Sequence, residues 1–281
     1  MLDDRTVVVT GGSLGVGRAI ALEAAGRGAR VVLAARHEGP LRDCLRDLPP
    51  VSGGEHLWQV VDVADPASVE AFATWCGQRL ERLDGLINSA GVYGPIGRLE
   101  DISVEEFLKA LRVNLVGTVH MTQVLLPLLR RSRRGKVVNL SGGGAASPFP
   151  RYSAYACSKV AVARFTENLA HEYPELDVNC LAPGFVVTRL HQETLAAGPE
   201  RAGQAFFEKT RQEVAGGGVP ARRAAELACF LLSPQSDGIS GRFLAAPWDP
   251  WEDPGFQERL RREPHLATLR RIDDRGFTAR P

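Results

Sequence analysis

The sequence predicts a single α/β domain built on a doubly wound parallel sheet. Short β-branched runs alternate with longer amphipathic segments, and the connections between them are short. Several of the short runs are apolar throughout, as expected of strands that are covered on both faces. The chain has 281 residues, which suits one large hydrophobic core better than two complete domains.

The alternation defines seven strands and several helices in chain order. Asp65 before Pro66 is a helix start, and Ser103 with Glu106 three residues on has capping-box spacing. The predicted strands are 6–10, 30–34, 57–62, 85–88, 136–140, 176–181 and 241–244. The predicted helices include 16–26, 66–83, 104–112, 115–131 and 155–173, the last of which stops before Pro174.

The composition changes near Pro247, after which the chain is rich in charge and proline and carries two of its four tryptophans. We therefore expect one domain over residues 1–246 and a C-terminal extension over 247–281, with no second domain. No internal repeat or low-complexity segment interrupts this organisation.

Charge and cysteine usage exclude several classes of protein. The formal net charge of +1 does not indicate binding to nucleic acid or to a membrane surface. The N-terminal segment lacks a signal-peptide pattern, and five scattered cysteines indicate reduced thiols, so we expect a cytoplasmic protein. The six histidines have no metal-ligand spacing, so no metal is expected, and His171 and His191 are interpreted as surface or loop residues.

The first candidate binding motif, TGGSLGVG, follows the first strand and opens a helix. Glycines allow a tight turn and close approach to a pyrophosphate, while the helix N-terminus offers free N–H groups to the anion. The alternative is a glycine-rich turn without a ligand. The candidate residues are Gly11, Ser13, Leu14, Gly15, Val16 and Gly17.

The end of the second strand indicates which dinucleotide is bound. An acidic residue here would bind a ribose 2′-hydroxyl, but the chain has Ala35 followed by Arg36. An arginine can pair with a 2′-phosphate, which favours NADP(H) over NAD(H). The alternative is that Arg36 is simply a solvated loop residue.

Two further strand ends carry weaker signals for the adenosine part of a cofactor. Asp62, with Val63, could accept a hydrogen bond from an adenine amino group, or it could cap the N–H of Val63 or Ala64. The small residues around Asn88, Ala90 and Gly91 would let a ribose lie against the backbone.

Tyr155 and Lys159 form the candidate catalytic pair. At positions i and i+4 of a helix they share one face. A nearby ammonium favours the phenolate, lowers the pKa of the tyrosine and makes it a usable proton relay. Taken alone, this spacing is also typical of an ordinary surface helix.

Together these motifs resemble the short-chain dehydrogenase/reductase family over roughly residues 5–245, a family with a Rossmann fold. The matching pieces are TGGSLGVG, NSAG, the VN of RVNLVGT, VVNLS, YACSK and PGFVVT. The resemblance implies that Tyr155 is the catalytic acid/base, that Lys159 is its partner and that Asn114 holds a relay water. It also implies a substrate lid near residues 189–220, with a plain helical insertion as the alternative, and a homodimer or homotetramer. Pro183, Gly184, Val186 and Thr188 would border the nicotinamide.

The chain departs from the family where a serine usually polarises the substrate carbonyl. That position, 13 residues before Tyr155, is Gly142, and Ser141 stands one residue earlier. We expect Ser141 to fill the role, with Ser147, Ser153 or a backbone N–H as alternatives.

The expected activity is hydride transfer between the nicotinamide and a carbonyl or secondary alcohol. The sequence does not name the substrate. The alternatives are a non-redox lyase, dehydratase or isomerase on the same fold, and a dinucleotide-sensing binding protein.

Overall fold

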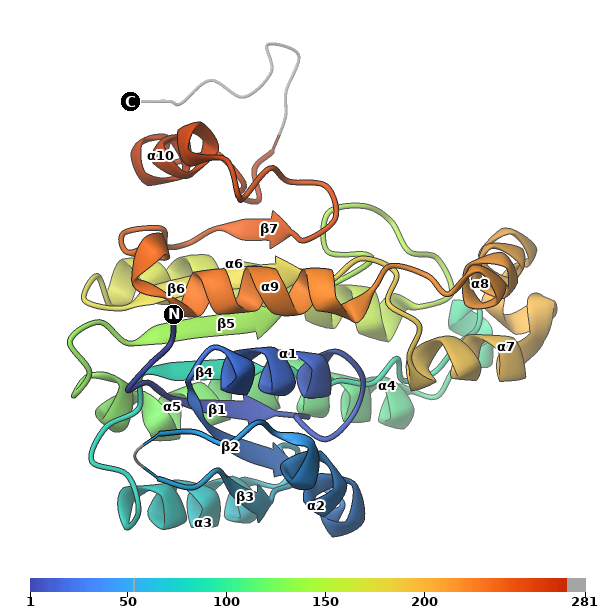
Figure 1. Cartoon of the computed structure of the whole chain (residues 1–281). Coiled ribbons are helices and arrows are strands. Elements are labelled where there is room, and N and C mark those ends of the chain that lie inside the picture. Colours follow the sequence, from blue (N-terminus) through green and yellow to red (C-terminus); the bar gives the residue numbers. More distant parts are fainter. Residues whose placement is uncertain (53, 272–281) are drawn as a thin grey trace.

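The computed structural model describes residues 1–52 and 54–271 and contains one seven-stranded parallel sheet, in the order β3-β2-β1-β4-β5-β6-β7 (Figure 1). The order reverses direction between β1 and β4, as in a doubly wound sheet. The predicted fold class is therefore confirmed. The strands are β1 (Thr6–Thr10), β2 (Arg30–Ala35), β3 (Leu57–Val60), β4 (Gly85–Asn88), β5 (Lys136–Leu140), β6 (Asp177–Ala182) and β7 (Phe243–Ala245).

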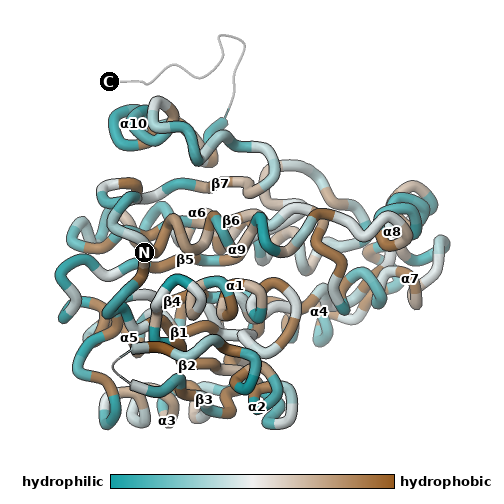
Figure 2. Tube along the Cα trace, viewed as in Figure 1, coloured by the Kyte–Doolittle hydropathy of each residue, from teal (hydrophilic) through white to brown (hydrophobic). Residues whose placement is uncertain are grey.

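Helices cover both faces of the sheet (Figure 1). One face carries α1 (Gly15–Gly26), α2 (Glu38–Asp47) and α9 (Ala221–Leu232), and the other carries α3 (Pro66–Gly77), α5 (Gly117–Leu129) and α6 (Ser153–Glu172). The buried side chains accordingly form two large hydrophobic clusters, one on each side of the strands. Figure 2 shows the same pattern, with hydrophobic residues concentrated in the central strands.

Local signals explain where several helices begin and end. Asp65 accepts the N–H of Ala67 at the start of α3, and Ser103 accepts the N–H of Glu106 at the start of α4 (Val104–Leu111), as the capping patterns predict. The prediction that the helix at 66 continues to 83 is wrong, since α3 ends at Gly77. One turn of π-helix, Arg112–Val116, joins α4 to α5. Such turns occur frequently at functional sites.

Two further helices project beyond the carboxyl ends of the strands (Figure 1). These are α7 (Arg189–Ala202) and α8 (Gln204–Gly216), which occupy most of the segment predicted as a lid. Gly198 interrupts α7 with a φ of 76°, and Gly203 separates the two helices with a φ of 83°. Glycine adopts such left-handed conformations without the steric cost that other residues incur.

The chain beyond Pro247 packs back onto the sheet. Trp251, and Leu260 in the helix α10 (Pro254–Arg262) that follows it, are buried in the same cluster as α1 and α9. The N–H of Phe243 in the outer strand β7 donates to the carbonyl of Ala267 at 2.7 Å. Residues 272–281 of the predicted extension lie outside the described residues. No helix in the described part of the chain is long and apolar enough to cross a membrane.

A buried ionic cluster ties the amino ends of β5 and β6 together. Lys136 Nζ lies 2.6 Å from Asp177 Oδ2, and neither side chain is exposed to solvent. Arg134 forms a two-bond pair with the same carboxylate, and Asp237 accepts a further bond from Lys136 at 2.6 Å. This cluster lies at the end of the sheet opposite the candidate site, so its role is structural.

Candidate active site

The strand register brings the predicted binding residues to one edge of the sheet. Thr10 pairs with Ala34 on one side and with Asn88 on the other, and Asn88 pairs with Asn139. The loops that follow these strands, which hold Gly11, Arg36, Ser89 and Ser141, therefore share the carboxyl edge. Ligands of open parallel sheets bind at this edge, next to the reversal in strand order.

The glycine-rich turn is packed so closely that side chains would not fit. A Cβ on Gly17 would lie 2.3 Å from the carbonyl oxygen of Gly11, and a Cβ on Gly11 would lie 2.9 Å from Ala90. Gly11 and Gly15 have φ values of 62° and 56°. No side chain caps the N-terminus of α1, whose first residues are Gly15 and Val16. Its N–H groups and positive dipole end are thus open to an anion, which fits a pyrophosphate.

Thr10 connects this turn to the loop after β4. Its hydroxyl accepts the N–H groups of Ser89 and Ala90 at 3.0 and 3.2 Å. Asn88 points instead into the core, where its amide nitrogen donates to Thr122 and Asn139. Asn88 therefore stabilises the end of β4 from the core side, while Ala90 and Gly91 lie in the loop that follows this strand. Ser13 is buried and Leu14 is exposed in the neighbouring turn.

Arg36 is exposed directly after β2, and its guanidinium has no hydrogen bond or ion pair with any described residue. It is therefore available to an anion at this edge. Asp62 is partly engaged, since its Oδ1 accepts the N–H of Ala64 at 3.0 Å. The capping alternative for Asp62 is thus observed. Val63 packs against Gly117 at the start of α5.

Tyr155 and Lys159 meet on the inner face of α6, and both are buried. Lys159 Nζ lies 5.5 Å from the centre of the Tyr155 ring and donates to the carbonyl of Leu140 at 2.8 Å. The Tyr155 hydroxyl has no hydrogen-bond partner among the described residues. Burial raises the pKa of Tyr155 and lowers that of Lys159 to about 8. In the protein alone, the prediction that Lys159 lowers the pKa of Tyr155 is wrong, because desolvation of the buried hydroxyl raises it.

Asn114 lies in the π-helical turn and is fully buried. Its side chain accepts the N–H of Val92 and donates to the carbonyl of Val92, both at 2.8 Å. It also donates to Ser158 Oγ at 2.9 Å. A Cβ on Gly91 would lie 3.4 Å from Asn114 Oδ1 and 3.6 Å from Lys159 Nζ. Asn114 thus holds the loop after β4 close to the lysine.

Gly142, rather than Ser141, faces the tyrosine hydroxyl. A Cβ at position 142 would lie 2.6 Å from Tyr155 Oη. Ser141 is buried, and its hydroxyl donates to the backbone carbonyl of Lys159 at 3.2 Å. The structure therefore does not bring the Ser141 hydroxyl to the Tyr155 hydroxyl. Of the alternative serines, Ser147 is exposed and Ser153 begins α6.

The loop after β6 closes the site from the other side. Gly184 has a φ of 80°, and a Cβ there would lie 2.9 Å from Pro247. A Cβ on Gly15 would lie 3.2 Å from the Thr188 methyl group, so this loop adjoins the glycine-rich turn. Within this loop Val186 is buried, while Pro183 is half-buried.

Sequence reasoning missed a cluster of rings that surrounds Tyr155. Tyr93 lies edge-to-face against Tyr155 with ring centres 4.9 Å apart, and Phe149 lies 6.3 Å away. Phe149 stacks on Tyr152 at 4.4 Å, and Phe206 of α8 contacts both. These residues come from three distant segments, so no spacing in the sequence indicates that they meet.

His191 was also misjudged, because it is only 8% exposed rather than at the surface. It lies in the first turn of α7, and its ring packs against the ring of Phe185. The capping arrangement with Thr188, three residues earlier, could have indicated an inward position.

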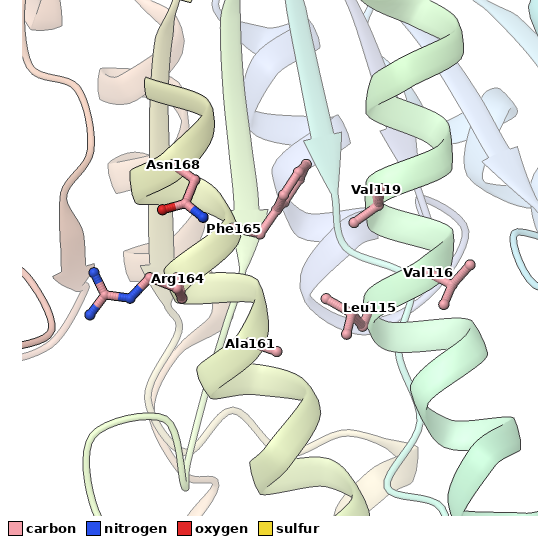
Figure 3. Close-up of a pocket in the computed structure, with 7 residues that line it drawn as sticks. All are labelled: Leu115, Val116, Val119, Ala161, Arg164, Phe165 and Asn168. Atoms are coloured by element: carbon pink, nitrogen blue, oxygen red, sulfur yellow. The ribbon is translucent and has the colours of Figure 1, made fainter. Parts of the chain in front are cut away.

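An open hollow of about 450 Å³ lies elsewhere, between the outward faces of α5 and α6 (Figure 3). Apolar side chains such as Leu115, Val119 and Phe165 line it, together with Arg164 and Asn168. It contains none of the predicted binding or catalytic residues. No group of three or more potential metal ligands occurs in residues 1–52 and 54–271.

Comparison with known proteins identifies the class that this fold and site define. Residues 5–198 match the family model described as short chain dehydrogenase. The chain therefore belongs to the short-chain dehydrogenase/reductase family, and it is an oxidoreductase. The non-redox enzyme and the sensor considered from the sequence are set aside.

Individual relatives cover most of the chain. Levodione reductase of Leifsonia aquatica is 31% identical over 84% of this chain and 90% of its own length. L-fucose dehydrogenase of Bos taurus is 32% identical over 82% of this chain and 83% of its own. A solved structure of levodione reductase superposes with a TM-score of 0.78 at 30% identity, covering 90% of this chain and 98% of that one. A short chain dehydrogenase from Shigella flexneri 2a str. 301, solved in complex with NADP, gives a TM-score of 0.76 at 28% identity, covering 87% and 98%.

Proposed function

We propose that this protein is an NADP(H)-dependent oxidoreductase that transfers a hydride between the nicotinamide and a carbonyl or secondary alcohol carbon, with Tyr155 as the acid/base. The observation that carries the proposal is the unpartnered Tyr155 hydroxyl, held beside Lys159 at the same sheet edge as the open N-terminus of α1. The bound cofactor would supply the hydride, and the chain supplies orientation and a proton path.

Tyr155 is suited to act as an acid in the reducing direction. Because burial raises the pKa of its hydroxyl, the proton is held at neutral pH and can pass to the alkoxide oxygen that forms as the carbonyl is reduced. Lys159 lies between the tyrosine and the loop at Gly91, where it would bind the cofactor ribose. Asn114 positions that loop, and its predicted water relay stays a proposal.

NADP(H) rather than NAD(H) is proposed on the basis of Arg36. No acidic side chain follows β2 directly, and the unpaired guanidinium can form charge-assisted bonds with a 2′-phosphate. Similar structures solved with NADP and with NADPH support this choice. The glycine turn would hold the pyrophosphate, and Asp62 with Val63 would border the adenine. Pro183, Gly184, Val186 and Thr188 would border the nicotinamide.

The role predicted for Ser141 requires its hydroxyl to leave the carbonyl of Lys159. It stays a prediction, and a Ser141→Ala variant with an unchanged kcat would remove it. The division into a catalytic domain and an extension, the cytoplasmic location and the homodimer or homotetramer likewise stay predictions.

The test is a fluorescence titration with NADPH and with NADH, followed by a ketone screen that monitors NADPH oxidation. Tyr155→Phe should retain NADPH affinity and lose nearly all turnover, because only the proton donor is removed. Tyr152→Phe is the matched control, since its hydroxyl donates to Thr194 and not to the reacting centre. Turnover like that of the wild type in Tyr155→Phe would overturn the assignment.

A further inference from the structure

The rings around Tyr155 pack together as one apolar group, here named the aromatic cluster: Tyr93, Phe149, Tyr152, Phe185 and Phe206. Tyr152 is fully buried within it, whereas Phe149, Phe185 and Phe206 are partly exposed. Tyr93 and Phe149 contact the Tyr155 ring directly, and Phe206 links them to Phe185 at 6.4 Å. The members come from the loop after β4, the segment before α6, the loop after β6 and α8. A substrate that reaches the Tyr155 hydroxyl therefore packs against these rings, which favours a flat apolar ring system.

No member of the aromatic cluster carries a charge. Two charged residues of the adjoining lid have partners within the protein: Arg201 Nε donates to the carbonyl of Ile96 at 3.1 Å, and Glu193 pairs with Arg189 at 3.4 Å. Arg151 donates to the carbonyl of Glu200. An unpaired carboxylate or ammonium in this pocket would lose its hydration without compensation.

His191 is the polar exception beside the aromatic cluster. Its ring lies 4.0 Å from the centre of Phe185 and 6.2 Å from that of Tyr93. Nδ1 accepts the backbone N–H of Thr188 at 3.3 Å. Burial lowers the pKa of His191 to about 4, so the ring is neutral near pH 7. A neutral imidazole whose Nδ1 is an acceptor carries its hydrogen on Nε2.

The Nε2–H of His191 has no hydrogen-bond partner among the described residues, although the residue as a whole is only 8% exposed. On an imidazole ring, Nε2 points away from the group bound at Nδ1, so this N–H is directed away from the Thr188 backbone. A donor left open in a residue that is otherwise enclosed is available to water or to a ligand. The ring contacts Tyr93, which in turn contacts Tyr155, while no direct ring contact joins His191 to Tyr155 in the described structure.

We propose that His191 Nε2–H donates a hydrogen bond to a second oxygen of the substrate, which is an uncharged, ring-containing ketone or alcohol held by the aromatic cluster. This inference rests on the proposed function, because it takes Tyr155 as the group that meets the reacting oxygen. Because both rings contact Tyr93 but no ring contact joins His191 to Tyr155, the oxygen that His191 binds is taken as a different one from the oxygen that Tyr155 protonates. His191 is therefore a specificity-determining residue.

The experiment compares NADPH-dependent reduction of cyclohexanone with that of cyclohexane-1,2-dione and cyclohexane-1,4-dione, and uses 4-oxopentanoate as a charged probe. We expect kcat/KM for at least one dione to exceed that for cyclohexanone by about tenfold or more, the effect of one good hydrogen bond. We also expect 4-oxopentanoate to be the poorest substrate.

Two substitutions test the roles of the two ring nitrogens of His191 separately. Asn in His191→Asn can still accept the Thr188 N–H but cannot reach the position of Nε2, so the preference for the dione should be lost while cyclohexanone turnover and NADPH affinity are kept. Gln in His191→Gln places a donor near Nε2 and should restore part of the preference. His171→Asn, on the exposed end of α6, is the control.

Each contrary result has one meaning. A dione preference that survives in His191→Asn, equal turnover of the diones and cyclohexanone, or preferred turnover of 4-oxopentanoate overturns this inference and leaves the proposed function standing. Weaker NADPH binding in His191→Asn would also overturn this inference, because it would show that the Nε2–H binds the cofactor and not the substrate. Absence of NADPH oxidation with every ketone removes the proposed function and this inference together.

Discussion

The Tyr155 hydroxyl lies where a side chain at position 142 would begin, since a Cβ on Gly142 would be 2.6 Å from Tyr155 Oη. The observed position of the tyrosine hydroxyl therefore requires a residue without a side chain at position 142. In this arrangement a serine at position 142 would displace the hydroxyl before it could polarise a carbonyl.

Gly142→Ala and Gly142→Ser should accordingly lower kcat without changing NADPH affinity. Misplacing a reacting group by about 1 Å can reduce the rate about 100-fold, and we expect an effect approaching that size in steady-state assays. Gly143→Ala is the control, because a Cβ there meets Phe149 at an ordinary 3.7 Å. A faster Gly142→Ser enzyme would show that the tyrosine has room to move.

Arg36→Ala should weaken NADPH binding and leave NADH binding unchanged, because only NADPH carries the 2′-phosphate. Loss of hydrogen bonds to a charged group should raise the dissociation constant about 10- to 100-fold, measured by fluorescence titration. Arg46→Ala, which breaks an exposed pair with Asp43, should leave both affinities unchanged. Equal weakening of NADPH and NADH in Arg36→Ala would mean that Arg36 does not read the phosphate.

His191 should make the fold sensitive to acid. Burial lowers its pKa from 6.5 to about 4, so between these values the unfolded chain binds a proton that the folded chain excludes. The contribution to stability is thus complete above pH 6.5 and is lost as the pH falls toward 4, with a slope of at most about 1.4 kcal/mol per pH unit. Urea denaturation across this range should give a shallower slope for His191→Asn, and an unchanged slope for the exposed His171→Asn. Parallel curves for wild type and His191→Asn would contradict the assignment of a buried neutral ring.

Lys136→Met should destabilise the fold, because the fully buried carboxylate of Asp177 would lose one of its partners. Removing one member of a buried ion pair typically costs about 3 to 5 kcal/mol in the free energy of unfolding. Arg211→Ala, which removes an exposed pair with Glu208, should leave the free energy of unfolding nearly unchanged. Comparable effects of the two substitutions in urea denaturation would contradict the buried-cluster assignment.

Local patterns predicted the sheet well. β1, β4 and β5 have the predicted bounds, because β-branched runs buried on both faces end at glycine or polar residues. Long-range packing was not predictable in the same way. The end of α3 at Gly77 falls short of the predicted residue 83, and the burial of His191 depends on how α7 packs against distant segments.

The candidate site shows the same division. Motif spacing identified the glycine turn, Tyr155 and Lys159, since these are local in sequence. It could not show that the Ser141 hydroxyl reaches the Lys159 carbonyl, or that desolvation raises the pKa of Tyr155. Both follow from burial, which depends on the whole fold.

The hydrogen bond from the Phe243 N–H to the Ala267 carbonyl helps to prevent β7 from pairing with a strand of another molecule. An outermost strand with unpaired backbone groups is a template for edge-to-edge association. Here the chain's own C-terminal segment lies along β7 and uses one of those groups, and Arg164 anchors it at the carbonyl of Leu269. A substitution that released this segment would leave the catalytic edge untouched and would uncover a surface prone to aggregation.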